Sequence, residues 1–416
     1  MDKRKNVITY FFGKIIPALC QLAILTFGVR LLGKAEFGKY ILLFNAAMII
    51  SSLAAGWIQQ SILRFFFSYR ENRHAAIRKF YQLALLAALF SLVTGLITGT
   101  IYFQLNWISN LVFSGVTALM TLLFVELTIR QVQFKSLGYA TMESSYYLFS
   151  LLIAFALIYF FSMNNSFAFF YGMFITLTVL LAGKLLFQLF FTASKSANTQ
   201  EIVKKDFLIR MFGFGFPLTL WLLISGLFNY SDRYIIQHYT TLDQVGAYSA
   251  IYDFVYKVSA FLCMPVLLSY HPAISQSWEE KKFSECRRLI KKLIGFELFI
   301  LVLLIVGYLL FSDWIFNVFI LLREKNLLVT VIPLAVSSIL WQSVLFIQKP
   351  LEMLFMQKKM LWCISLTLLL NILCNIWFIP IFGYPAAAYS TLMCTLVYCF
   401  AAYYFSANEF NKIIHA

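Results

Sequence analysis

The sequence predicts an all-α polytopic membrane protein with about 12 transmembrane helices, arranged as two parallel six-helix bundles. Three observations lead to this fold class: the hydrophobic composition, the number of long apolar runs, and a motif pattern that occurs twice. Hydrophobic residues make up 61% of the 416 residues and charged residues only 12%. A water-soluble fold could not bury so much apolar surface, so lipid must be the solvent for much of the chain.

The apolar runs define the expected helices. A helix that crosses a bilayer needs about 20 predominantly apolar residues. Twelve such runs are found, at roughly residues 7–32, 37–62, 79–103, 107–129, 143–162, 166–191, 208–231, 246–270, 290–312, 327–348, 360–379 and 384–406.

A repeated pattern divides these helices into two halves. In each half an apolar run carries an early glycine and proline, ends at an arginine, and is followed by a short polar loop and a Gly-x-Tyr sequence. The two copies are Phe12-Gly13, Pro17, Arg30-Leu31-Leu32-Gly33 and Phe37-Gly38-Lys39-Tyr40, then Phe214-Gly215-Phe216-Pro217, Ser231-Asp232-Arg233-Tyr234 and Val245-Gly246-Ala247-Tyr248. Duplicated halves of this kind are common in transporters.

The repeat also predicts the domain organisation. Six helices per half is an even number, so both halves enter the membrane from the same side as parallel repeats. We predict an N-terminal lobe at 1–191, a polar linker at 192–207, a C-terminal lobe at 208–406 and a tail at 407–416.

Basic residues predict the orientation of the chain. Most of the 33 Lys and Arg residues lie at the N-terminus and in every second loop after it, whereas the opposite side holds only Arg30, Lys34, Lys39, Arg233, Arg323 and Lys325. Cytoplasmic loops carry the excess of Lys and Arg, so both termini are predicted to be cytoplasmic. These loops explain the net charge of +15 without a nucleic-acid partner, and they favour anionic membrane lipids.

The sequence argues against an enzyme. The loops on the outer side are short, the four His residues have no partner at metal-ligand spacing, and the seven Cys residues form no Cys-x-x-Cys motif. Gly28…Gly33-Lys34 and Gly33…Gly38-Lys39 match only the first part of a P-loop, because Ala35 and Tyr40 stand where Ser or Thr is needed. No metal or other cofactor is therefore expected.

Basic residues within or near the apolar runs are candidate ligands for an anion, since ionisable groups at bilayer depth tend to face a cavity. Lys14 lies a third of the way into the first run, and Arg30 and Arg233 occupy matching positions in the repeat. The alternative for each is a long side chain that extends to the interface. For Arg30 and Arg233 the repetition favours a shared role at a substrate site or gate, and a guanidinium suits a phosphate.

Three carboxylates are candidates for ion coupling or gating. Asp232 is expected to pair with Arg233, and Asp253 lies one helical turn from Lys257 on the same helix face. Glu126 either pairs with Arg130, one turn away, or binds a proton or sodium ion. Glu297 lies more than a turn from Lys292 near a helix end and ranks lower.

Two prolines are candidate hinges. Pro17 and Pro217 come early in the first run of each half. Proline removes an intrahelical hydrogen bond and bends a helix, so a matched pair could serve alternating access or simply packing.

These patterns resemble the Wzx-type polysaccharide flippases of the multidrug/oligosaccharidyl-lipid/polysaccharide exporter superfamily. The resemblance is carried by Arg30-Leu-Leu-Gly33…Phe37-Gly-Lys-Tyr40 and, more specifically, by Ser231-Asp-Arg-Tyr-Ile-Ile236…Val245-Gly-Ala-Tyr-Ser249. The length and the twelve-helix plan fit the family over essentially the whole chain.

The resemblance implies a V-shaped transporter in the bacterial inner membrane that flips undecaprenyl-pyrophosphate-linked oligosaccharide to the outer leaflet for O-antigen or capsule synthesis. It makes Lys14, Arg30, Arg233 and Lys257 candidate head-group contacts, and Asp253 and Glu126 candidates for coupling to H⁺ or Na⁺. It also implies membrane lipids, a polysaccharide polymerase and a chain-length regulator as partners.

Three other functions remain open from the sequence. An ion-coupled drug or cation antiporter of the same superfamily would need an excess of carboxylates, whereas the deep charges here are mainly basic. A lipid II flippase often carries additional helices. A membrane-embedded polysaccharide polymerase would normally bring a large outer loop, and the longest one here, about residues 313–326, is short.

Overall fold

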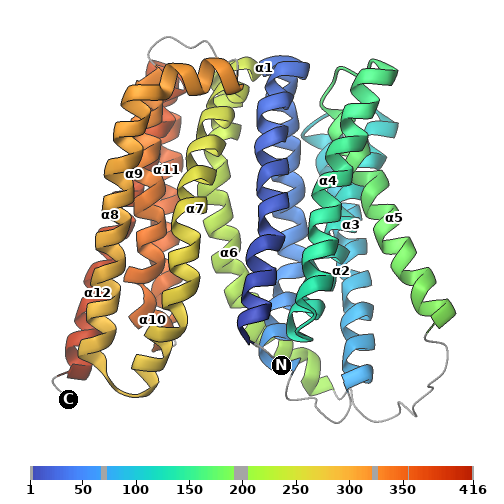
Figure 1. The fold of residues 1–416 in the computed structure, drawn as a ribbon. Helices are drawn as coiled ribbons and strands as arrows, with labels where there is room; N and C mark the ends of the chain where they lie inside the picture. The colour runs from blue at the N-terminus through green and yellow to red at the C-terminus, as the bar shows by residue number, and fades with distance from the viewer. Residues whose placement is uncertain (1–2, 67–72, 192–204, 321–326, 355, 415–416) are drawn as a thin grey trace. The chain divides into compact units, whose positions relative to one another are not determined.

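A computed structural model describes residues 3–66, 73–191, 205–320, 327–354 and 356–414 (Figure 1). All regular elements within these ranges are helices. They are α1 (Lys3–Phe65), α2 (Arg73–Ile101), α3 (Trp107–Val132), α4 (Ser136–Phe161), α5 (Phe167–Phe191), α6 (Lys205–Tyr239), α7 (Leu242–Glu279), α8 (Phe283–Trp314), the π-helix η2 (Ile315–Ile320), α9 (Leu327–Ile347), α10 (Lys349–Met353), α11 (Gln357–Phe382) and α12 (Pro385–Ile414). The prediction of an all-α membrane fold is confirmed.

Each of the twelve predicted apolar runs lies in one of these helices, and α1 contains two of them. A straight helix of 63 residues would be about 95 Å long, roughly three times the thickness of the hydrocarbon core. The helix is instead broken at Gly33, whose φ of 78° and ψ of 167° are not helical. The predicted polar loop at this point is therefore a break at one glycine, a residue that tolerates positive φ, and α1 consists of two arms.

Ten helical segments among the described residues are long and apolar enough to span a membrane, and one of these covers both arms of α1. The chain is therefore a multi-pass membrane protein. Helix α7, with 38 residues, is not among these ten described segments.

The contacts divide the chain into two compact units. The first unit comprises residues 1–24 and 40–223, and the second comprises residues 25–39 and 224–416. Compared with the predicted lobes, two segments are exchanged. Residues 25–39 of α1, on both sides of the break at Gly33, belong to the second unit, and the first half of α6 belongs to the first. The predicted linker at 192–207 lies almost wholly outside the described residues, and most of the predicted tail continues α12 as helix.

Both units pack their helices in the same pairs. In the first unit α2 packs on α3, α4 on α5, and α3 on α5; in the second unit α8 packs on α9, α11 on α12, and α9 on α12. The most buried membrane spans among the described residues are α3 and α9, which hold corresponding positions. The internal repeat seen in the sequence is thus also a repeat of helix packing.

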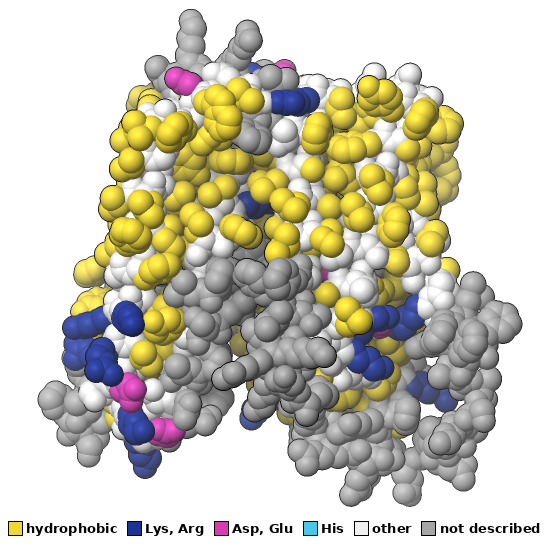
Figure 2. All heavy atoms as spheres, viewed as in Figure 1, with side chains coloured by type: hydrophobic (Ala, Val, Ile, Leu, Met, Phe, Trp, Pro, Cys, Tyr) yellow, Lys and Arg dark blue, Asp and Glu magenta, His cyan; other side chains and the backbone are white. Residues whose placement is uncertain are grey.

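The outer faces of these helices are apolar. On α8, for example, Phe299, Leu303, Leu310 and Phe311 are exposed. Figure 2 shows hydrophobic side chains over most of the visible helices, with Lys and Arg gathered near one end. Lys281, Lys282, Arg287, Arg288, Lys291 and Lys292 are all exposed at the start of α8 or just before it. An apolar face of this kind suits lipid.

Candidate functional site

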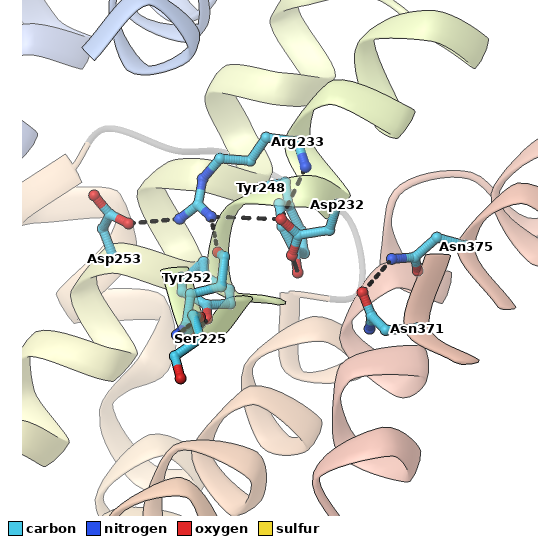
Figure 3. Close-up of polar contacts among 9 residues, drawn as sticks. Ser225, Asp232, Arg233, Tyr248, Tyr252, Asp253, Asn371 and Asn375 are labelled. Atoms are coloured by element: carbon cyan, nitrogen blue, oxygen red, sulfur yellow. Dashed lines mark hydrogen bonds and ion pairs between the residues drawn. The ribbon is translucent and has the colours of Figure 1, made fainter. Parts of the chain in front are cut away.

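The second unit contains a buried network of charged side chains where α6 packs against α7. Arg233 of α6 has no solvent exposure, and its guanidinium lies between Asp253 and Asp232 (Figure 3). Its Nη2 donates to Asp253 Oδ1 at 2.7 Å, and its Nη1 lies 3.4 Å from Asp232 Oδ1. Nη1 also donates to the backbone oxygen of Asn229 at 2.5 Å. Arg233 therefore joins two carboxylates that are 21 residues apart in sequence.

Aromatic residues of α7 complete the surroundings of this arginine. Tyr248 donates its hydroxyl to Asp232 Oδ2, and Tyr252 donates to Asn229 Oδ1 at 2.8 Å. The guanidinium carbon lies 4.3 Å from the ring centre of Tyr252, within cation–π range. Tyr252 in turn stacks on Tyr256 with ring centres 4.1 Å apart. These tyrosines follow one another at four-residue spacing, so one face of α7 lies against Arg233.

The network ends at a partly exposed lysine. Asp253 is 19% exposed at its side chain, and its Oδ2 lies 3.4 Å from Lys257 Nζ, which is 33% exposed. Asp253 thus contacts a buried cation with one oxygen and an accessible cation with the other. The Asp253–Lys257 and Asp232–Arg233 pairs expected from the sequence are both present.

The four charges of this network balance: two carboxylates face one guanidinium and one ammonium. Removing one partner of a buried pair leaves an uncompensated charge, which is strongly unfavourable. Several polar atoms beside the network still lack a hydrogen-bond partner among the described residues, namely Arg233 Nε, Ser225 Oγ, Ser231 Oγ and Ser249 Oγ. The site therefore has spare hydrogen-bonding capacity.

The first unit contains a second charged cluster, centred on Glu126 of α3. Arg130 Nε donates to Glu126 Oε1 at 2.7 Å, so the i, i+4 pair expected from the sequence is present. Lys184 of α5 pairs with Glu126 Oε2, and Tyr81 of α2 donates its hydroxyl to the same oxygen. Glu126 is only 3% exposed, and Arg130 also donates to the backbone oxygen of Gly138. This arrangement neutralises the carboxylate from two directions.

The remaining predicted residues lie apart from these clusters. Arg30 is exposed in α1 and donates to the backbone oxygen of Val318 in η2. Lys14 lies within α1, but its side chain is outside the described part of the structure. Pro17 and Pro217 lie inside α1 and α6. The break in α1 falls at Gly33 rather than at Pro17, and the hinge role of both prolines stays a prediction.

Sequence reasoning did not find several members of these clusters. By its sequence Lys184 belongs with the Lys and Arg residues predicted on the cytoplasmic side, yet its side chain pairs with Glu126, 58 residues away. Tyr81 and Tyr252 carry no signal except that they are tyrosines in apolar runs, and Tyr248 stands out only as part of the repeated Gly-x-Tyr sequence. Four-residue spacing from Tyr248 through Tyr252 to Tyr256 is the one pattern that could have revealed an aromatic face. Among the described residues no group of three or more His, Cys, Asp or Glu side chains could hold a metal ion.

Comparison with known proteins identifies a family and a fold. Residues 4–278 match the model of a family described as polysaccharide biosynthesis protein. No curated protein sequence matches the chain.

Solved structures with a similar fold include an inward-facing multidrug resistance MATE family transporter of the MOP superfamily, with a TM-score of 0.78, 10% identity, and coverage of 97% of this chain and 96% of that one. An outward-facing multidrug resistance MATE family transporter of the MOP superfamily has a TM-score of 0.70 and 12% identity, and the match covers 98% of this chain and 94% of that one. The lipid II flippase MurJ in an inward closed conformation has a TM-score of 0.69 and 14% identity, and the match covers 99% of this chain and 90% of that one.

Proposed function

Because the chain belongs to the polysaccharide biosynthesis protein family, we propose that it flips undecaprenyl-pyrophosphate-linked oligosaccharide from the cytoplasmic to the outer leaflet of a bacterial inner membrane. The observation that carries this proposal is the family match over residues 4–278. The MATE-like membrane fold supports a transporter, and alternating access is the mechanism that a two-lobed transporter of this kind uses.

The charged head group of such a substrate needs a polar path across the membrane, which a protein with buried cations can supply. A pyrophosphate and a sugar chain cannot cross hydrocarbon unaided, because each charge at the bilayer centre is costly. A polyprenyl tail can stay in lipid while the head group passes along a polar surface. The protein must therefore offer a cation to the pyrophosphate and release it again.

We assign the first contact with the head group to Lys257. It is the exposed cation of the α6–α7 network, and its 3.4 Å contact with Asp253 is loose for a charge-assisted hydrogen bond. A pyrophosphate can compete with Asp253 for this ammonium, because Asp253 would still be paired with the buried Arg233. Arg30, which is exposed, is the second candidate, and Lys14 remains a third.

Arg233 requires a different step before it can bind substrate. Its guanidinium is fully buried and engaged with Asp232, Asp253 and Asn229. It can contact a head group only in a conformation in which this network opens, which makes Arg233 and Asp253 candidates for gating. Coupling to H⁺ or Na⁺ through Asp253 or Glu126 belongs to the same proposal.

The excess of Lys and Arg in every second loop supports an orientation with both termini in the cytoplasm. In the cell, we expect the flipped oligosaccharide to pass to a polysaccharide polymerase with its chain-length regulator. The predicted lobes 1–191 and 208–406 would then move relative to one another during transport.

A substrate panel tests the proposal. The purified protein is reconstituted into liposomes, and three substrates are supplied separately: fluorescent undecaprenyl-pyrophosphate oligosaccharide, labelled lipid II, and a cationic dye with an imposed ion gradient. Faster exposure of the oligosaccharide to an outside-only probe is the expected result. Selective movement of lipid II or of the dye would instead indicate the other flippase or a drug antiporter, and formation of longer glycan would indicate a polymerase.

A further inference from the structure

Helix α8 carries a carboxylate on its buried face. The buried positions of this helix are Cys286, Leu293, Glu297, Ile300, Leu304, Tyr308 and Ser312, at the three- and four-residue spacing of a face packed against neighbouring helices. Glu297 is only 2% exposed within this otherwise largely apolar stripe. Lys291 and Lys292 are exposed on other faces of the same helix. A carboxylate here contradicts the local pattern, and such contradictions are expected at functional positions.

The surroundings of Glu297 contain no cation that pairs with it in the described part of the chain. Ser343 of α9 donates its hydroxyl to Glu297 Oε2 at 2.6 Å. Cys263 of α7 and Cys399 of α12 are close enough to interact electrostatically with the carboxylate. Lys349, which follows α9, instead pairs with Glu352 at 2.5 Å. Among the described residues, the polar groups found to interact with Glu297 are therefore one hydroxyl and two thiols.

The first unit offers a comparison, because it holds a buried carboxylate that protein cations neutralise. Glu126 lies among α2, α3 and α5, and the packing repeat makes these helices the counterparts of α8, α9 and α12. There Arg130 and Lys184 both pair with the carboxylate, and Tyr81 donates a further hydrogen bond. At the corresponding junction of the second unit, no Lys or Arg of the described residues pairs with the carboxylate. The two halves thus place one carboxylate each at equivalent helix junctions but neutralise only one of them with protein charges.

A bound proton is the neutralising partner that fits the second junction. An unpaired carboxylate at this depth is strongly unfavourable, and protonation removes its charge. A sodium ion fits less well, because hard cations prefer a shell of oxygen ligands and two of the three neighbours are thiols. A protonated carboxyl keeps the hydrogen bond from Ser343, because Oε2 can accept it as the carbonyl oxygen.

We propose that Glu297 is a proton-binding site of the second unit, and that it binds and releases a proton during the transport cycle. The part of the proposal that concerns transport rests on the flippase function proposed above, whereas the presence of a bound proton does not. Release becomes favourable when a change in the packing of α8 against α7, α9 and α12 admits water to the carboxylate. The proton would then link the packing state of this unit to the pH of one compartment.

Infrared difference spectroscopy on the purified protein tests the proton itself. The C=O stretch of a protonated carboxyl is recorded as pH is varied, for wild type, Glu297→Gln and Asp313→Asn. Glutamine keeps the size of the side chain and can still accept from Ser343. Asp313 lies on the same helix but is exposed, so it serves as the matched control. We expect a buried protonated-carboxyl band in wild type and in Asp313→Asn that is lost in Glu297→Gln. The Ser343→Ala variant should shift this band, because it removes the one hydrogen bond.

Transport in liposomes with an imposed pH gradient tests the coupling. We expect the gradient to accelerate lipid-linked oligosaccharide flipping by wild type and Asp313→Asn, and the acceleration to be lost in Glu297→Gln. Identical infrared spectra for wild type and Glu297→Gln would overturn the proton site. If Glu297→Gln loses the infrared band but the pH gradient still accelerates its flipping as in wild type, the role of Glu297 in transport is overturned. Absence of flipping in every protein, with the band still present in wild type, would instead count against the flippase function.

Discussion

Replacing Arg233 by methionine is the sharpest test of the α6–α7 network. Methionine approximates the length of the arginine side chain but leaves Asp232 and Asp253 without their shared cation. Asp232 is fully buried and Asp253 is 19% exposed, so neither carboxylate is well hydrated. Breaking a buried ion pair by removing one partner costs about 3–5 kcal/mol. We therefore expect the free energy of unfolding to fall by about this amount.

Lys257→Met provides the matched comparison. Lys257 is 33% exposed and lies 3.4 Å from Asp253, so solvent screens the pair. Pairs of this kind contribute about 0–1 kcal/mol. The two substitutions remove one cation each from the same aspartate, and the structure predicts a severalfold difference between their effects. A double variant, Arg233→Met with Asp253→Asn, should recover part of the loss because it removes one of the uncompensated carboxylates.

Free cysteines make the assay possible. Four buried cysteines, Cys263, Cys286, Cys363 and Cys394, lie in the second unit and one, Cys20, in the first. In a Cys20→Ser background a thiol-reactive fluorophore therefore reports when the second unit opens on heating in detergent. The expected order of unfolding midpoints is wild type, then Lys257→Met slightly lower, then Arg233→Met much lower. Equal midpoints for Arg233→Met and wild type would refute the reasoning, and so would a loss in Lys257→Met as large as that in Arg233→Met.

Three further predictions follow from the structure. Glu126→Gln leaves Lys184 partly buried without its carboxylate, so we expect a stability loss of about 3 kcal/mol or more in a denaturant titration, and an unchanged stability would contradict the pairing. Gly246→Ala places a Cβ against the backbone of Lys34 and should destabilise the protein by about 1–3 kcal/mol. In Gly295→Ala the new Cβ meets no atom within 4 Å, so this variant should be neutral or slightly stabilised. Equal thermal midpoints for the two variants would refute this prediction. Tyr252→Leu removes the ring over Arg233 and should lower the unfolding midpoint more than Tyr252→Phe, which keeps the ring. Both variants lose the hydrogen bond to Asn229, so equal midpoints would show that the ring contributes nothing beyond that bond.

The positions of the helices could be predicted from the sequence because they depend on local composition. Twenty apolar residues form a helix in lipid whatever the rest of the chain does, since every backbone polar group must be satisfied internally. Pairs one helical turn apart, such as Asp253 with Lys257 and Glu126 with Arg130, could be predicted for the same reason. They depend only on helix geometry.

Contacts between distant helices could not be predicted in this way. Lys184 reaches Glu126 across 58 residues, and nothing local distinguishes it from a lysine of a basic loop. Arg30 and Arg233 have matching sequence contexts, yet one is exposed and the other fully buried. The chain breaks at Gly33 soon after Arg30, whereas α6 continues to Tyr239 and holds Arg233 against α7. Tertiary packing therefore gives two repeated residues different surroundings.

The most direct test of the central claim compares the flipping rate of undecaprenyl-pyrophosphate oligosaccharide by wild type, Lys257→Met, Lys257→Arg and Lys359→Met in liposomes. Lys359 pairs with Glu409 at 2.7 Å on α11 and α12, outside the α6–α7 network, so its variant controls for the loss of a paired lysine. A charge-assisted contact with the pyrophosphate contributes about 1.5–3 kcal/mol, or roughly ten- to a hundredfold in rate. The account predicts a loss of this size in Lys257→Met, substantial recovery in Lys257→Arg and little change in Lys359→Met. Equal flipping rates for wild type and Lys257→Met would contradict it.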